Sequence, residues 1–173
     1  NWLSKKRQPF LFKKLIKMDI MQNTINWYNG EIFEGKFILG FGFFLILTAL
    51  LFYFLGNTPS AKALLIPLLV IGIFFSLTGA YMIRSNGKQK QEIAKKYEQN
   101  PKEFINAEII RVDDFQYLYP MSIAISLACF LIAIALLYFT QYVHLRAIAI
   151  SLILFGMAFT VIDYFSKESA FIY

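Results

Sequence analysis

One acidic residue, Asp163, lies inside the otherwise apolar stretch 145–165. A carboxylate removed from water needs a cation or a proton to offset its charge. Lys167 follows four residues later, one helical turn away, and Arg84 ends another apolar stretch. We interpret Asp163 as one member of an ion pair with Arg84 or Lys167 that joins two helix ends. The alternative is a proton or cation site.

A second acidic group comprises Glu108, Asp113 and Asp114. Carboxylate oxygens are the ligands that divalent cations prefer, but consecutive helical residues point in different directions, and Arg111 stands between these three. We therefore expect a surface that faces solvent or a partner protein. The residues that we assign to this candidate partner surface are Ile105, Glu108, Ile109, Arg111 and Val112.

Two other reactive residue types occur once each, as Cys129 and His144. A single cysteine forms no intrachain disulfide, and a single histidine assembles no histidine metal cluster or histidine-containing triad within one chain. The sequence also has no glycine-rich phosphate loop and no nucleophile elbow. It predicts a protein that is not an enzyme and that holds neither a metal nor a cofactor.

The segments that carry these residues are mostly apolar. Four stretches, 37–55, 63–83, 119–140 and 145–165, contain almost no formal charge, and each approaches the roughly 20 residues of helix that cross a hydrocarbon core of about 30 Å. The whole chain is 58% hydrophobic. We predict an all-α integral membrane bundle of four transmembrane helices in two antiparallel hairpins, because each pair of stretches is joined by a short loop.

Basic residues predict the orientation of these helices. Of the 17 lysines and arginines, only Lys62 and Arg146 lie in or directly beside the two short loops. By the positive-inside rule, both termini and the central polar segment lie in the cytoplasm, and the protein belongs in a cytoplasmic (inner) membrane as a multi-pass protein. Anionic lipid headgroups account for the net charge of +6, so we expect the bilayer as a partner and no nucleic acid.

The chain therefore divides into five parts. A basic segment opens it, in which residues 8–21 are expected to form a short helix in the headgroup layer or a disordered tail. Asn100, Pro101 and Glu103 form a capping-box pattern that starts a new helix within the central cytoplasmic helical segment. The boundaries are 1–36 for the N-terminal segment, 37–83 for the first transmembrane hairpin, 84–118 for the cytoplasmic segment, 119–165 for the second hairpin and 166–173 for the tail.

Small residues recur at intervals of four within the apolar stretches. Helices in lipid associate by close packing, which favours small residues at their contacts. We expect these residues to face other helices and not a ligand. They are Gly72, Ser76, Ala80, Ser122, Ser126, Ala147 and Ser151.

Several features together resemble a loosely defined group of small, uncharacterised, four-span bacterial integral membrane proteins. They are the two hairpins, Asn26-Trp27-Tyr28 after a basic lead, the polar stretch from Asn100-Pro101 to Arg111, and the ending Asp163-Tyr164-Phe165-Ser166. The resemblance implies the four-span topology and a bacterial membrane, and it implies no activity.

These observations favour a non-enzymatic accessory or scaffold subunit that binds another membrane protein or a second copy of itself. One alternative is a small oligomeric channel or transporter that uses Asp163. Another is an immunity-type protein that blocks a pore-forming toxin through helix contacts, which four spans and small size suggest.

Overall fold

The computed structural model describes the backbone of residues 2–116 and 118–172 and the side chains of 21–93, 95–111 and 120–164. Every element in the described part is a helix: α1 (Trp2–Leu55), α2 (Pro59–Ala63), α3 (Leu65–Gln99), α4 (Pro101–Gln116), α5 (Leu118–Phe139) and α6 (Val143–Ile172). The all-α prediction is therefore confirmed. Four helical segments are long and apolar enough to cross a membrane, namely Met21–Leu55, Pro59–Gln99, Pro120–Phe139 and Val143–Tyr164.

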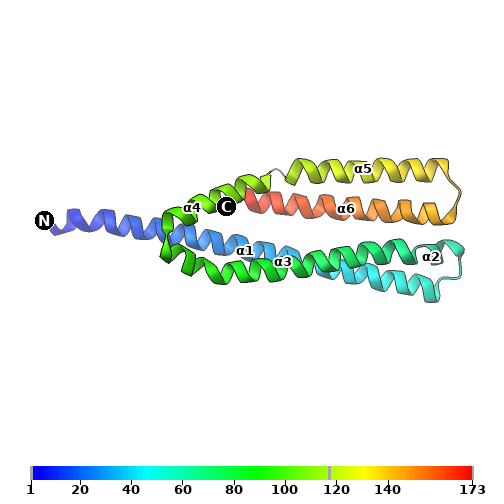
Figure 1. Ribbon diagram of the computed structural model, residues 1–173, viewed down its shortest axis with the longest axis horizontal. Coiled ribbons are helices and arrows are strands. Elements are labelled where there is room, and N and C mark those ends of the chain that lie inside the picture. Colours follow the sequence, from blue (N-terminus) through cyan, green and yellow to red (C-terminus); the bar gives the residue numbers. More distant parts are fainter. Residues whose placement is uncertain (1, 117, 173) are drawn as a thin grey trace.

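The helices lie roughly parallel to one long axis, in two pairs (Figure 1). α1 packs along α3, and α5 packs along α6. α6 also contacts α1, α2 and α3, so it lies between the α1–α3 pair and α5. The short connections α1–α2–α3 and α5–α6 lie at one end of the molecule, and α4 and both chain ends lie toward the other (Figure 1).

α1 is longer than the sequence suggested. The residues 8–21 do not form a separate short helix, because their backbone continues α1 without a break (Figure 1). Its 54 residues would extend over about 80 Å at 1.5 Å per residue. Asn29-Gly30, a pair common in turns, does not end the helix, since α1 packs against α3 before it at Tyr28 and after it at Gly35.

α1 and α3 meet along a stripe with the spacing of an antiparallel coiled coil. Apart from Trp27, the buried positions of α1 alternate between steps of four and three, the 3.5-residue period of such a pair. They are Thr24, Tyr28, Glu31, Gly35, Ile38, Gly42, Leu45 and Ala49. Leu68, Gly72, Phe75 and Gly79 continue the same period on α3. The stripe passes from the apolar part of each helix into its polar part.

Glycines let the two backbones approach closely within this stripe. A Cβ placed on Gly72 would lie 2.8 Å from Ile46 Cγ1, and one on Gly79 would lie 2.5 Å from the Leu39 nitrogen. Gly42 faces Ser76 and Gly72 in the same way. Close backbone approach of this kind is how helices associate where lipid removes the hydrophobic driving force.

The expected row of small residues on α3 is therefore partly corrected. Gly72 and Ser76 lie at the contact with α1, but Ala80 is exposed and Gly79 takes its place. The reason is the period of the stripe, since a pair with a 3.5-residue repeat alternates steps of three and four. A constant step of four drifts away from the contact.

The second pair buries the other small residues. Ser122, Ser126, Ala147 and Ser151 are buried. Gly156 faces the ring of Phe130, with its added Cβ 3.1 Å from the nearest ring atom. The buried small residues and the contact of Gly156 with the Phe130 ring thus join α5 to α6.

Aromatic rings join α6 to the α1–α3 pair. Phe75 is almost fully buried, and its ring centroid lies 5.5 Å from those of Phe41 and Phe155. Phe155 in turn stacks on Phe159 at 5.4 Å. Such pairs stabilise a contact by about 0.5–1.5 kcal/mol each beyond the burial of their area.

Candidate functional site

The polar parts of α1 and α3 enclose an aromatic cluster where α4 crosses them. Its buried members are Trp27, Tyr28, Ile93, Tyr97 and Phe104. The Trp27 and Tyr28 rings meet edge to face with centroids 5.0 Å apart, and Tyr97 and Phe104 do so at 5.5 Å. These residues come from three helices, so the cluster fixes α4 against the α1–α3 pair.

The turn into α4 follows local capping chemistry. The backbone N–H of Glu103 donates to Asn100 Oδ1 at 3.3 Å, and Asn100 Nδ2 donates to the Glu103 side chain at 2.9 Å. Pro101 is the first residue of the helix. The predicted helix start is confirmed, and the reversal directs α4 back toward α5 (Figure 1).

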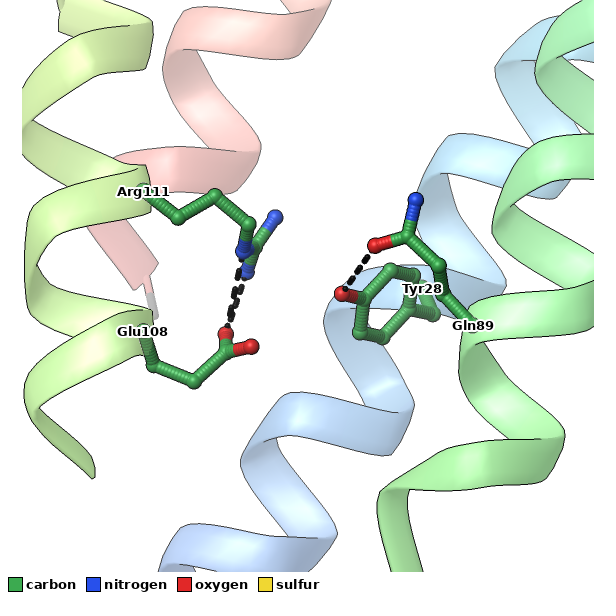
Figure 2. Close-up of polar contacts among 4 residues, drawn as sticks. All are labelled: Tyr28, Gln89, Glu108 and Arg111. Carbon is green, nitrogen blue, oxygen red and sulfur yellow. Dashed lines mark hydrogen bonds and ion pairs between the residues drawn. The ribbon is translucent and has the colours of Figure 1, made fainter. Parts of the chain in front are cut away.

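Arg111 on α4 reaches across to α1. Its guanidinium carbon lies 3.8 Å from the Trp27 ring centroid and 5.1 Å from that of Tyr28. Its Nε and Nη2 donate to Glu108 Oε2 at 3.1 and 2.6 Å, as Figure 2 shows. The carboxylate offsets the charge of this partly buried guanidinium, and the aromatic rings cover its planar face.

Polar side chains also link α1 directly to α3 beside the cluster. The Tyr28 hydroxyl donates to Gln89 Oε1 at 2.9 Å (Figure 2), and Gln89 Nε2 donates to Ser85 Oγ at 3.3 Å. Lys90 Nζ donates to Asn29 Oδ1 at 2.6 Å. These bonds specify the register of the two helices in their polar part.

Glu31 is the unusual member of this region. It is only 3% exposed, it lies before the apolar part of α1 that begins at Phe37, and its Oε1 has no hydrogen-bond partner among the described residues. Burial and, to a smaller extent, the charge of Glu34 raise the pKa of Glu31, and Arg111 opposes them, so that the pKa is about 7. Glu31 therefore titrates near neutral pH.

The candidate partner surface has a different composition from the one expected. Glu108 and Arg111 turn toward α1, and Ile105 packs against the aromatic cluster. Ile109 is 55% exposed, and its neighbour Ile110 is 61% exposed. Val112 lies outside the described side chains. The correction follows from helix geometry, because residues 104, 105, 108 and 111 share one face of α4 and that face is covered.

The expected ion pair is not present between its two described members. Asp163 is half-buried and Arg84 is exposed, and among the described side chains the two make no ion pair with each other. Lys167, as well as Asp113 and Asp114, lies outside the described side chains. No three His, Cys, Asp or Glu residues in the described part are placed to hold one metal ion.

A long apolar groove lies between α1 and α6. Its volume is about 570 Å³. Phe37, Ile38 and Phe41 on α1 face Leu154 and Ala158 on α6 across it. The groove forms where α6 packs against the α1–α3 pair. The sequence did not predict this packing.

The Arg111 contact yields a testable prediction. Replacing Arg111 by methionine removes the charge above Trp27 and leaves Glu108 without its ion pair, so α4 should detach more readily, at a cost of about 1–3 kcal/mol. In a Trp2→Phe background, Trp27 is the remaining tryptophan. We expect red-shifted emission and stronger acrylamide quenching. Arg146→Met, at the opposite loop, should change neither, and an unchanged spectrum in both variants would contradict the assignment.

Comparison with known proteins gives no relative from which a role could be transferred. No protein-family model, curated protein or solved structure matches this chain.

Proposed function

We propose that this chain is a non-enzymatic accessory or scaffold subunit of a larger membrane complex, and that it binds its partner through helices outside the bilayer. The observation that carries the proposal is the continuity of the α1–α3 stripe. The pair keeps the same period from the apolar part into residues 21–36 and 84–99, which we call the polar extension. This extension would project about 24 Å beyond the apolar part.

α4 completes the polar extension as a third helix. Arg111, the aromatic cluster and the capping box together hold α4 to it, which supports a preformed binding platform. A preformed surface loses less conformational entropy on binding than a flexible one. This favours a docking role for the extension.

The basic residues support an orientation for the extension. Lys88, Lys90, Lys95 and Lys96 lie on α3 beyond its apolar part, on the side of the molecule where both chain ends lie (Figure 1). Under the positive-inside rule this side is cytoplasmic. The proposal therefore places the extension in the cytoplasm. It places the two short loops on the opposite side of a bacterial inner membrane.

Ile109 and Ile110 are the residues that we propose for partner contact. They are adjacent, more than half exposed and located on the face of α4 that turns away from Trp27. Complete burial of an exposed isoleucine contributes about 1.5–3 kcal/mol, and these two are still more than half exposed, so a partner helix that covers them gains part of that free energy from each.

The experiment is stoichiometric co-purification after extraction in mild detergent. We expect one partner species to remain bound to the wild type and to be lost, at least about tenfold, when Ile109 and Ile110 are both replaced by glutamate. A control with Gln99→Glu and Lys102→Glu places two glutamates at the exposed tip of the extension and should retain the partner.

Two results would contradict the scaffold proposal. One is a stable lone monomer in native membranes, as measured by cross-linking before extraction. The other is ion or substrate flux in liposomes that contain only this chain and that disappears with Asp163→Asn, which would favour the oligomeric transporter instead.

A further inference from the structure

The outward face of α3 changes from apolar to basic along its length. The exposed residues between 66 and 77 are all apolar. Tyr81 follows on the same face and is 73% exposed. Continuing in steps of three, four and seven, which keep to one face of a helix, come three exposed cations, Arg84, Lys88 and Lys95. One helix face therefore carries apolar side chains, then a tyrosine, then positive charges.

The length of the apolar run gives the height of these cations relative to a bilayer. Residues 63–83 extend over about 30 Å of helix, which is the thickness of a hydrocarbon core, so Ile83 lies at its edge when α3 stands along the membrane normal. Arg84 and Lys88 then lie about 2 Å and about 8 Å beyond that edge, in or at the border of a headgroup layer about 5–8 Å thick. Lys95 lies about 18 Å beyond it and outside this layer.

The side chains at this height suit a phosphate group. The amphipathic ring of Tyr81 belongs at the border between hydrocarbon and headgroups. Arg84 offers a planar guanidinium that can donate two parallel hydrogen bonds to phosphate oxygens, and the flexible stem of Lys88 lets its ammonium group reach back toward the membrane. Residues four apart on a helix are neighbours, so both cations can contact one headgroup.

Acidic side chains in the described part leave these two cations available. The stretch of α3 from 65 to 91 contains no aspartate or glutamate. Glu92 is one turn beyond Lys88, but its carboxylate pairs with Lys96 at 3.0 Å. Neither Arg84 nor Lys88 makes an ion pair with a described side chain. The positive charge at the base of the polar extension is therefore directed outward, toward an anion that the chain itself does not supply.

We infer that Arg84 and Lys88 bind the headgroup of an anionic phospholipid in the leaflet next to the polar extension, with its acyl chains along Ile73 and Leu77. The inference rests on the part of the proposed function that places the extension outside the bilayer, and it adds a lipid ligand at the base of that extension. Charge complementarity and the continuous apolar face below the cations identify a lipid as the occupant, because a phospholipid joins an anionic head to an apolar tail in the same order. The site requires no partner at Ile109 and Ile110.

The test uses the full chain alone, in nanodiscs of phosphatidylcholine that contain a small fraction of phosphatidylglycerol with a photoreactive group near the start of one acyl chain. After irradiation, peptide mapping measures lipid adducts at Leu77 and Tyr81, which are exposed on the same face within two turns of Arg84. Replacing Arg84 and Lys88 together by glutamine should reduce these adducts roughly tenfold, because each basic residue at an anionic surface adds to lipid binding.

The matched control replaces Lys95 and Lys102 together by glutamine. Both lysines are exposed, and the pair removes the same net charge as the Arg84→Gln, Lys88→Gln variant. They lie farther along the polar extension, outside the headgroup layer. A diffuse effect of net charge would change both variants alike, whereas a site at Arg84 and Lys88 affects one of them.

The expected result is strong labelling by the phosphatidylglycerol probe in the wild type and in the control variant, and weak labelling in the Arg84→Gln, Lys88→Gln variant. Equal labelling of the two double variants would overturn the site. Equal labelling of the wild type by the corresponding phosphatidylcholine probe would overturn the anionic headgroup.

Two further outcomes separate this site from the proposed function. Adducts at Gln91 with both lipids would place acyl chains beside the polar extension, which would overturn the proposed function together with the site. A co-purified acidic protein that is lost from the Arg84→Gln, Lys88→Gln variant, with lipid labelling unchanged, would assign this face of α3 to a protein and overturn the lipid site alone.

Discussion

Replacing Gly79 by leucine is expected to separate α1 from α3 and to have the largest effect on stability of any single change considered for this pair. An added Cβ would lie 2.5 Å from the Leu39 nitrogen and 2.6 Å from the Gly35 carbonyl oxygen. Both are backbone atoms, so no side chain can rotate away to relieve the overlap. Overpacking of this kind costs about 3 kcal/mol, which corresponds to a fall of roughly 10 °C in melting temperature.

The control for this prediction is Gly87→Leu in the same helix. A Cβ at Gly87 would meet nothing within 4 Å. Both variants therefore gain the same helix propensity, but only Gly79→Leu places a side chain against the backbone of the neighbouring helix. Melting in detergent, followed by size-exclusion chromatography after heating, measures both. Equal melting temperatures for the two variants would show that the helices are farther apart than described.

The second large effect concerns the pH dependence of stability at Glu31. Its pKa rises from the ordinary 4.5 to about 7, mainly because burial disfavours the charged carboxylate, with a further contribution from Glu34 and an opposing one from Arg111. Between these two pH values the folded protein binds a proton that the unfolded chain does not. Stability is therefore fully present below about pH 4.5 and falls as the pH rises to about 7, by a total of the order of 3 kcal/mol.

Glu31→Gln should remove this dependence, because the amide has the same shape and never ionises. We expect the melting temperature of the wild type to be lower at pH 8 than at pH 5, and that of Glu31→Gln to change much less. Glu98→Gln removes one exposed carboxylate and should behave as the wild type does. A wild type whose melting temperature rises from pH 5 to pH 8 would refute a raised pKa at Glu31.

The sequence predicted the helical class and the four apolar segments because both depend on local composition. Apolar runs of about 20 residues are recognisable without tertiary information, and the start of α4 follows from Asn100, Pro101 and Glu103 alone. The sides of the membrane on which the loops and termini lie remain a prediction from the basic residues.

The helix contacts were harder to predict. Gly79 and Ala80 are neighbours, and both are small, so only the period of the whole stripe distinguishes them. The alternation of fours and threes from Thr24 to Ala49 was present in the sequence as a signal, but the polar residues Thr24 and Glu31 interrupt its hydrophobic character.

The polar cluster could not be predicted locally. Trp27 and Arg111 are far apart in the chain, and the fold brings them together through the reversal at Asn100. Glu108 and Arg111 are three residues apart, a spacing that brings side chains together on any helix, but this spacing did not indicate which side of α4 faces α1. The groove likewise depends on how α6 packs against α1.

The uninterrupted course of α1 has a mechanical consequence. Between Pro9 and the connection at Gly56, α1 contains no further proline, so a twist or tilt applied to its basic part after Pro9 by a bound molecule would be transmitted along this helix toward Gly56. Since α3 is tied to the same helix through glycine contacts, the two helices would turn together. A displacement at one end of this helix pair would then reach the other end without any intermediate joint.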